Sequence, residues 1–282
     1  MIDEILRQIF TNQWRVIVIV SLFLLAAAEL GFRFGLRLHR AKDEARKGQI
    51  GGVQGAMLGL LALLLGFTFA MAVGRYEKRR ELVLDEANAI GTTYLRASLL
   101  PPAHQAAVED LLRRYVDVRL EFYGAGADRA GQAAAEKDAA KIQRELWSHA
   151  IAAGKETPSP IVATFINTLN ETIDLDAARL HALRTHVPGA VWLLVLAVSA
   201  CGCCASGYGA GASGARSTFA NVSLPLLIAV VITLIADLDR PRHGLIGINQ
   251  QPLLDLKGSL APTQTDTDDR PQNTQVTPPR TR

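Results

Sequence analysis

The sequence predicts an all-α integral membrane protein, with four transmembrane helices and a helical cytoplasmic body inserted between the second and the third span. Two observations carry this prediction. Apolar residues are concentrated in blocks long enough to cross a bilayer, and the segment 76–186 between two of them repeats its apolar side chains at helical spacing. Hydrophobic residues make up 49% of the chain, and no strand-like alternation, internal repeat or glycine-rich phosphate loop occurs.

The four spans are placed from the distribution of charge. Segments 49–74, 187–215 and 217–236 contain no charged residue, and a helix of about 20 residues crosses the hydrocarbon layer. The first block is uncharged only from Val16 to Ala28, but Glu29 and Arg33 can neutralise each other on one helix face. A cleavable signal peptide is the alternative for this block, and the acidic start "MIDEIL" disfavours it. We place the spans at about 16–36, 50–74, 187–206 and 217–236.

The segment 76–186 is expected to form a helical body. The stretch "YEKRRELVLDEANAIGTTYLR" has no helix breaker, so the second span should continue well beyond the bilayer as far as "LLPP". A second helix should end at Gly124, and a third should run from Asp128 to about Gly154. A fourth should open with Ser159 as its cap and Pro160 at the first helical position.

Two shorter pieces complete the organisation. "SGYGAGASGARS", between the third and fourth spans, is typical of a flexible glycine-rich turn. The end of the chain, 261–282, has almost no apolar residues and should be disordered. We therefore expect one membrane domain over 1–260, followed by a disordered tail.

The composition argues against several classes of chemistry. The net charge of +3 is close to balanced and implies no nucleic-acid partner. The three cysteines, Cys201, Cys203 and Cys204, lie within one span without a nearby histidine, so we expect them to pack against a neighbouring helix and to bind no metal. Glu86 and Asn88 form one compact polar group, which is more typical of hydrogen bonds between helices than of catalysis. We expect no enzyme activity, metal or cofactor.

The topology is predicted from the cations near the ends of the spans, since these are more numerous in cytoplasmic loops. Six lie on one side, in the first loop and at Arg216, and ten lie on the other. The count favours a bacterial inner-membrane protein with both termini and the body in the cytoplasm. The ten are Arg7, Arg15, Arg75, Lys78, Arg79, Arg80, Arg179, Arg184, Arg240 and Arg242.

The second span has two different faces. Its small residues, above all Gly55, Gly59 and Gly66, form one stripe, which would allow close packing of helices in lipid. The opposite stripe holds larger side chains and ends in two arginines. That stripe either lines a pore or meets lipid, with the arginines reaching the headgroups, and spacing alone favours lipid. The large stripe consists of Met57, Leu61, Leu64, Thr68, Met71, Arg75 and Arg79.

A resemblance adds to these observations. "LLALLLGFTFAMAVGRYEKRRELVLDEANAIGTTYLRA" resembles the hallmark segment of the bacterial bestrophin-like family, and "LIADLDRPRHGLIGINQQPLLDL" resembles that family's ending after the last span. The stretch "RYEKRRELVLDEAN" is more distantly similar to the bestrophins themselves, which are pentameric anion channels with four spans, cytoplasmic termini and a pore lined by the second helix. Two features depart from that pattern. Only Asp237 and Asp239 stand where animal bestrophins carry an acidic calcium-binding run, and the characteristic tryptophans are absent.

The resemblance implies a function for the second span. We expect a homo-oligomer in the lipid bilayer, with five copies by analogy, that conducts small anions. The expected pore neck is Leu61, Leu64, Thr68 and Met71, and the expected selectivity charges are Arg75 and Arg79. The alternative is a membrane scaffold or sensor that conducts nothing and acts through its cytoplasmic helices.

Overall fold

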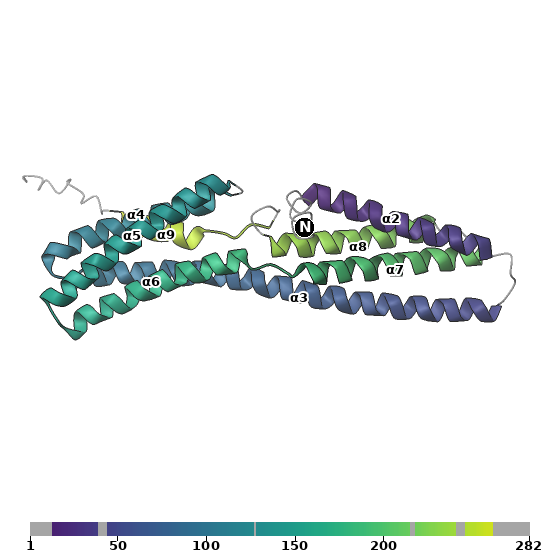
Figure 1. The fold of residues 1–282 in the computed structure, drawn as a ribbon, viewed down its shortest axis with the longest axis horizontal. Coiled ribbons are helices and arrows are strands. Elements are labelled where there is room, and N and C mark those ends of the chain that lie inside the picture. Colours follow the sequence, from purple (N-terminus) through teal and green to yellow (C-terminus); the bar gives the residue numbers. More distant parts are fainter. Residues whose placement is uncertain (1–12, 39–43, 127, 215–217, 241–245, 262–282) are drawn as a thin grey trace, which may run out of the picture.

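The described part of the chain is helical throughout. The structure is a computed structural model, and it describes residues 13–38, 44–126, 128–214, 218–240 and 246–261, over which it contains no strand. Figure 1 shows an elongated molecule with one helix running along most of its length. The helices are α2 (Gln13–Leu38), α3 (Glu44–Ala97), α4 (Pro102–Gly124), α5 (Arg129–Glu156), α6 (Pro160–Arg184), α7 (Gly189–Ser213), α8 (Thr218–Asp239) and α9 (Gln251–Leu260).

The helices form two groups along the long axis. Four segments are long and apolar enough to cross a membrane, and they include α2, α7, α8 and the first half of α3. These lie together at one end of the molecule, while α4, α5, α6 and α9 gather around the second half of α3 (Figure 1). The all-α class with four long apolar helices is therefore confirmed. The position of the membrane surfaces, and of the body relative to them, stays a prediction. Apart from Ala261, the predicted tail lies outside the described residues.

Helix α3 joins the two groups without a break. It has 54 residues and continues from the apolar stretch through Arg75 and Arg80 to Ala97. At a rise of 1.5 Å per residue it is about 80 Å long, far more than the roughly 30 Å of a hydrocarbon layer. The absence of a breaker in this stretch correctly predicted its continuity.

The closest helix contact described is between α2 and α7. An added Cβ on one of the glycines in this contact would overlap with a backbone carbonyl of the facing helix, for example that of Cys204 or Ala28. Small residues allow such an approach in lipid. The flexible turn predicted for "SGYGAGASGARS" is therefore wrong in its first half, because α7 continues to Ser213 and packs its glycines on α2. The four glycines are Gly31, Gly35, Gly207 and Gly211.

The glycines of α3 have a different environment. An added Cβ on Gly55, Gly59 or Gly66 would meet no atom within 4 Å. The opposite side of α3 packs against the other helices of its own chain, where Leu61 and Thr68 are each 3% exposed. The orientation we expected is thus reversed within one chain, because α7 and α8 cover the large residues and leave the small ones open. A contact between chains through these glycines stays a prediction.

The body has its own apolar core. Residues from α3 to α6 meet in it, and Leu253 of α9 is fully buried against them. The predicted cap of the fourth body helix is confirmed, since the Ser159 hydroxyl accepts a hydrogen bond from the Ile161 amide at 3.1 Å. The largest fully buried side chains of this core are Tyr115, Phe165, Ile90, Leu112, Leu146, Leu169 and Leu253.

Candidate functional site

Arg79 lies where the apolar helices join the body, and its guanidinium binds the ends of two other helices. It donates to the carbonyl oxygens of Ala182 at 2.9 Å and Thr185 at 2.8 Å, at the end of α6, and to that of Leu238 at 3.3 Å, at the end of α8. The last carbonyls of a helix have no partner within it and carry a partial negative charge, which suits a cation. Arg79 is 3% exposed. Within one chain Arg79 is therefore buried against protein acceptors, and its role as a selectivity charge stays a prediction.

Arg75 lies one turn earlier on α3 and remains partly accessible. Its side chain is 26% exposed, and its Nη1 lies 3.9 Å from Oδ1 of Asp239. This nitrogen is buried and has no hydrogen-bond partner, while Nη2 donates to the sulfur of Met71 at 3.7 Å. Of the two arginines predicted to act on anions, Arg75 is the one with accessible surface.

Asp239 and Asp237 hold backbone amides next to this arginine. Both carboxylate oxygens of Asp239 accept from the Val187 amide at 3.1 Å, just before α7 begins. Oδ2 of Asp237 accepts from the Ile246 amide at 3.1 Å. Among the described residues there is no group of three or more histidine, cysteine, aspartate or glutamate side chains that could hold a metal ion. The two aspartates act as fixed acceptors at the end of α8, where Asp239 binds the segment before α7 and Asp237 binds the chain after α8.

A buried ion cluster lies deeper in the body and consists of Glu86, Arg119, Arg179 and Asp176. Glu86 is fully buried and pairs with Arg119, whose Nε lies 2.7 Å from its Oε1, and with Arg179 through its Oε2. Arg119 also pairs with Asp176. The cluster joins α3, α4 and α6, so the predicted role of Glu86 in contacts between helices fits its position, while Asn88 is exposed.

Further groups surround this ion cluster. The guanidinium carbon of Arg179 lies 4.0 Å from the centre of the Tyr123 ring, and its Nη2 donates to Oε1 of Gln250 at 2.9 Å. Burial lowers the pKa of Arg119, but Glu86 and the other neighbouring acidic groups outweigh this and raise it overall. Burial raises the pKa of Asp176 above its usual value, against the opposing effect of Arg119.

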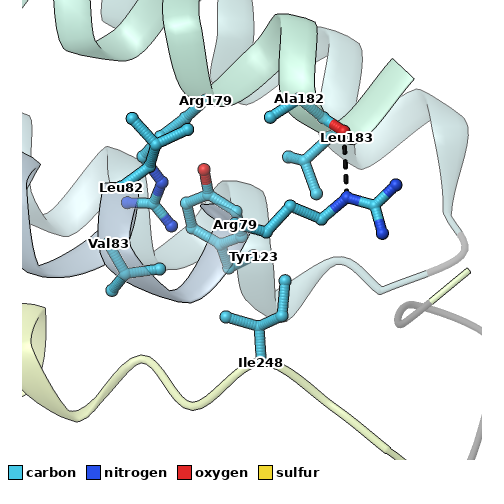
Figure 2. Close-up of a pocket in the computed structure, with 8 residues that line it drawn as sticks. All are labelled: Arg79, Leu82, Val83, Tyr123, Arg179, Ala182, Leu183 and Ile248. Carbon is cyan, nitrogen blue, oxygen red and sulfur yellow. Dashed lines mark hydrogen bonds between the residues drawn. The ribbon is translucent and has the colours of Figure 1, made fainter. Parts of the chain in front are cut away.

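A small hollow separates Arg79 from the ion cluster (Figure 2). It encloses about 190 Å³, part of which is open to solvent. The guanidinium of Arg79 points away from the hollow toward Ala182, and that of Arg179 is bound by Glu86 and Gln250. Both cations are therefore engaged by protein acceptors, and much of the wall is apolar. The remaining lining residues are Leu82, Val83, Tyr123, Leu183 and Ile248.

The residues predicted for a pore neck lie on the covered side of α3. Leu61 and Thr68 are buried, and the Thr68 hydroxyl donates to the Leu64 carbonyl of its own helix at 2.7 Å. Leu64 and Met71 are half-buried. The large side chains open to the surroundings lie elsewhere on α3, with Leu63 at 54% and Phe67 at 66% exposure.

Sequence reasoning missed Arg119, and it counted Arg179 as a cation near the end of a span, whereas Arg179 is buried and paired with Glu86 in the body. A signal for the first was present, because Arg119 follows Tyr115 and Val116 on the apolar stripe of α4 and precedes the buried Phe122. A charged residue on a buried stripe requires a partner, since an isolated buried charge is very costly. The identity of the partner, Glu86, comes only from the fold.

The comparisons with known proteins agree with this fold. A family model described as "Bestrophin-like domain" matches residues 20–253. Two solved structures of a bacterial bestrophin homologue from Klebsiella pneumoniae, each of a different point mutant, have the same fold. The first has a TM-score of 0.59 at 16% identity and covers 86% of this chain and 99% of its own. The second has a TM-score of 0.58 at 15% identity, with 83% and 99% covered. No curated protein matches the chain.

Proposed function

We propose that this chain, which belongs to the family of Bestrophin-like domains, assembles with copies of itself into a membrane channel that conducts small anions. Anion conduction is the activity known for bestrophins, and the solved neighbours are bestrophin homologues. The assembly would lie in a bacterial inner membrane, with the body and both termini in the cytoplasm, and five copies is the number implied by analogy.

One observation carries the proposal that α3 faces the axis of this assembly. Of the four apolar segments, the one containing α3 is the least covered by its own chain. Only 17% of its most apolar window is buried, compared with 33%, 33% and 50% for the others. A helix covered on one side only must meet lipid, other copies or a water-filled pore along the rest of its surface. In Figure 1, α3 lies along one edge of the bundle, on the side away from α2.

The open face of α3 suits a narrow apolar neck. Gly59, Leu63 and Phe67 follow each other at intervals of four residues, which places them on one line along the helix. Leu63 and Phe67 are exposed, and a Cβ added to Gly59 would meet open space. A ring of such side chains would form a hydrophobic constriction of the kind that gates by dewetting. This line takes the place of the neck predicted from Leu61, Leu64, Thr68 and Met71, whose side chains are covered to different degrees by the chain itself.

The two predicted selectivity arginines receive different roles. Arg75 keeps a direct role, because its side chain is partly exposed and its charge would add positive potential at the inner end of the neck. Arg79 acts indirectly by fixing the ends of α6 and α8 against α3 through its three carbonyl acceptors. Arg75→Gln should therefore change the anion selectivity of the channel, whereas Arg79→Gln should lower the stability of the folded protein.

Chloride flux into sealed proteoliposomes tests the proposal. The wild-type protein, at a known copy number per vesicle, should pass chloride, and Phe67→Ala should raise the flux by widening the neck. Phe69→Ala is the matched control, because Phe69 lies about 200° around the helix from Phe67 and is 39% exposed. Equal effects of the two alanine variants would refute the assignment of the neck. No wild-type anion flux over a range of pH and voltage would refute conduction and leave the scaffold or sensor function.

A further inference from the structure

Two histidines and a glutamate meet in the body, outside the groups described so far. His104 lies near the start of α4, and His149 and Glu156 lie near the end of α5. The Nδ1 atoms of the two histidines are 3.1 Å apart, with their rings inclined at 70°. On the other side of the first ring, Nε2 of His104 lies 3.3 Å from Oε2 of Glu156. We refer to these three residues as the histidine pair and its carboxylate.

The carboxylate determines which nitrogen of His104 carries the proton. An ionised glutamate only accepts hydrogen bonds, so Nε2 of His104 is the donor. In the neutral ring, Nδ1 of His104 then holds a lone pair, and this lone pair faces Nδ1 of His149. A contact at 3.1 Å is satisfied in one of two ways. Either Nδ1 of His149 donates its own proton to this lone pair, or both nitrogens carry lone pairs that bind a metal ion.

We propose that His104 and His149 bind a divalent transition-metal ion such as Zn²⁺ or Ni²⁺ through their Nδ1 atoms, in place of the hydrogen bond between them. Zn–N distances of about 2.0–2.1 Å at a tetrahedral angle separate two ligand nitrogens by about 3.3 Å, close to the separation in this pair. A metal-bound histidine usually donates its other N–H to a carboxylate, which is the position of Glu156. Imidazole is a preferred ligand of these ions.

Water completes the coordination. Glu156 is engaged by Nε2 of His104, so the site has two protein ligands and leaves the other positions to solvent. The side chain of His104 is 17% exposed and that of Glu156 is 54% exposed, which gives solvent a route to the histidine pair. The ion would connect the start of α4 to the end of α5, at the end of the body far from the apolar helices (Figure 1).

Metal binding can be measured without any conduction. The full-length protein, with its purification tag removed and its metals stripped by a chelator, is titrated with Zn²⁺ and separately with Ni²⁺ against a chromophoric competitor. We expect one histidine-dependent ion per chain. His104→Ala and His149→Ala should each weaken binding at least tenfold, and Glu156→Gln should weaken it about 10–100-fold. His181→Ala is the control, because His181 is exposed on α6 and its ring lies 3.4 Å from the hydroxyl of Thr185, which follows that helix.

Folding of each variant is checked by thermal unfolding in the absence of metal. His149→Gln serves as a second variant if the alanine protein does not fold, since glutamine keeps a polar side chain of similar length. A midpoint that rises with Zn²⁺ in the wild type, but not in the histidine variants, would support the site. If the wild type binds the ions no more tightly than a folded His149 variant, the two rings are joined by a hydrogen bond alone and the proposal is refuted.

Discussion

The replacement Glu86→Gln removes one charge from the centre of the ion cluster and keeps the shape of the side chain. Glu86 is fully buried and forms ion pairs with Arg119 and Arg179, each 3% exposed. After the change, Arg119 would keep the carboxylate of Asp176, while Arg179 would lose the carboxylate with which it pairs. Removing one partner of a buried ion pair costs about 3–5 kcal/mol, because a charge is left without compensation. Since domains are stable by only about 5–15 kcal/mol, this is a large fraction of the total.

Thermal unfolding in detergent, followed by circular dichroism, measures this loss. A cost of that size should lower the midpoint by roughly 6 to 20 °C for a chain of this length. Glu81→Gln is the matched control on the same helix, because the side chain of Glu81 is 58% exposed and pairs with Lys78 at 2.7 Å in solvent. Exposed pairs contribute little, so the midpoint should stay almost unchanged. Equal midpoints for the two variants would show that the ion cluster does not stabilise the body.

Three further predictions follow from the packing, the pKa of Asp176 and the topology. Gly207→Leu should abolish folding, since its side chain has no space beside the backbone of α2, whereas Gly59→Leu should leave the fold intact and alter the oligomer in native mass measurements. Because burial raises the pKa of Asp176 in the folded state, the wild type should lose stability relative to Asp176→Asn as the pH rises above about 4. Urea unfolding at several pH values measures this, and a difference in unfolding free energy that stays constant with pH would contradict it. In a background with the native cysteines replaced by alanine, Ala130→Cys should react with an impermeant reagent only from the cytoplasm and Ser213→Cys only from the periplasm; the reverse labelling would overturn the topology.

Local sequence was enough to predict the helices themselves. Uncharged blocks located the four apolar helices, and the lack of a breaker between Gly74 and Leu99 predicted that α3 would continue into the body. The N-cap of α6 at Ser159 and the end of α4 at Gly124 were also predicted correctly, because the ends of a helix depend on residues only a few positions apart.

Contacts between distant residues could not be predicted in this way. The face of α3 that packs inside the chain depends on where α7 and α8 lie. The periodicity of the sequence therefore defined two stripes on α3, but it could not show which stripe these helices cover. The acceptors of Arg79 lie more than 100 residues away, at Ala182, Thr185 and Leu238, and they are backbone carbonyls without a side-chain pattern. Glycine spacing suggested close packing on α3, but the same residue type makes that contact at α2 and α7.

The continuity of α3 has a mechanical consequence for the assembly. A single helix of about 80 Å acts as a lever, and each degree of tilt about one end displaces the other by about 1.4 Å. Arg79 and Glu86 bind α3 to α4, α6 and the end of α8 part-way along this lever. A partner that moves the body by a few degrees would therefore displace the far end of α3 by several ångströms, without any change in the helix itself.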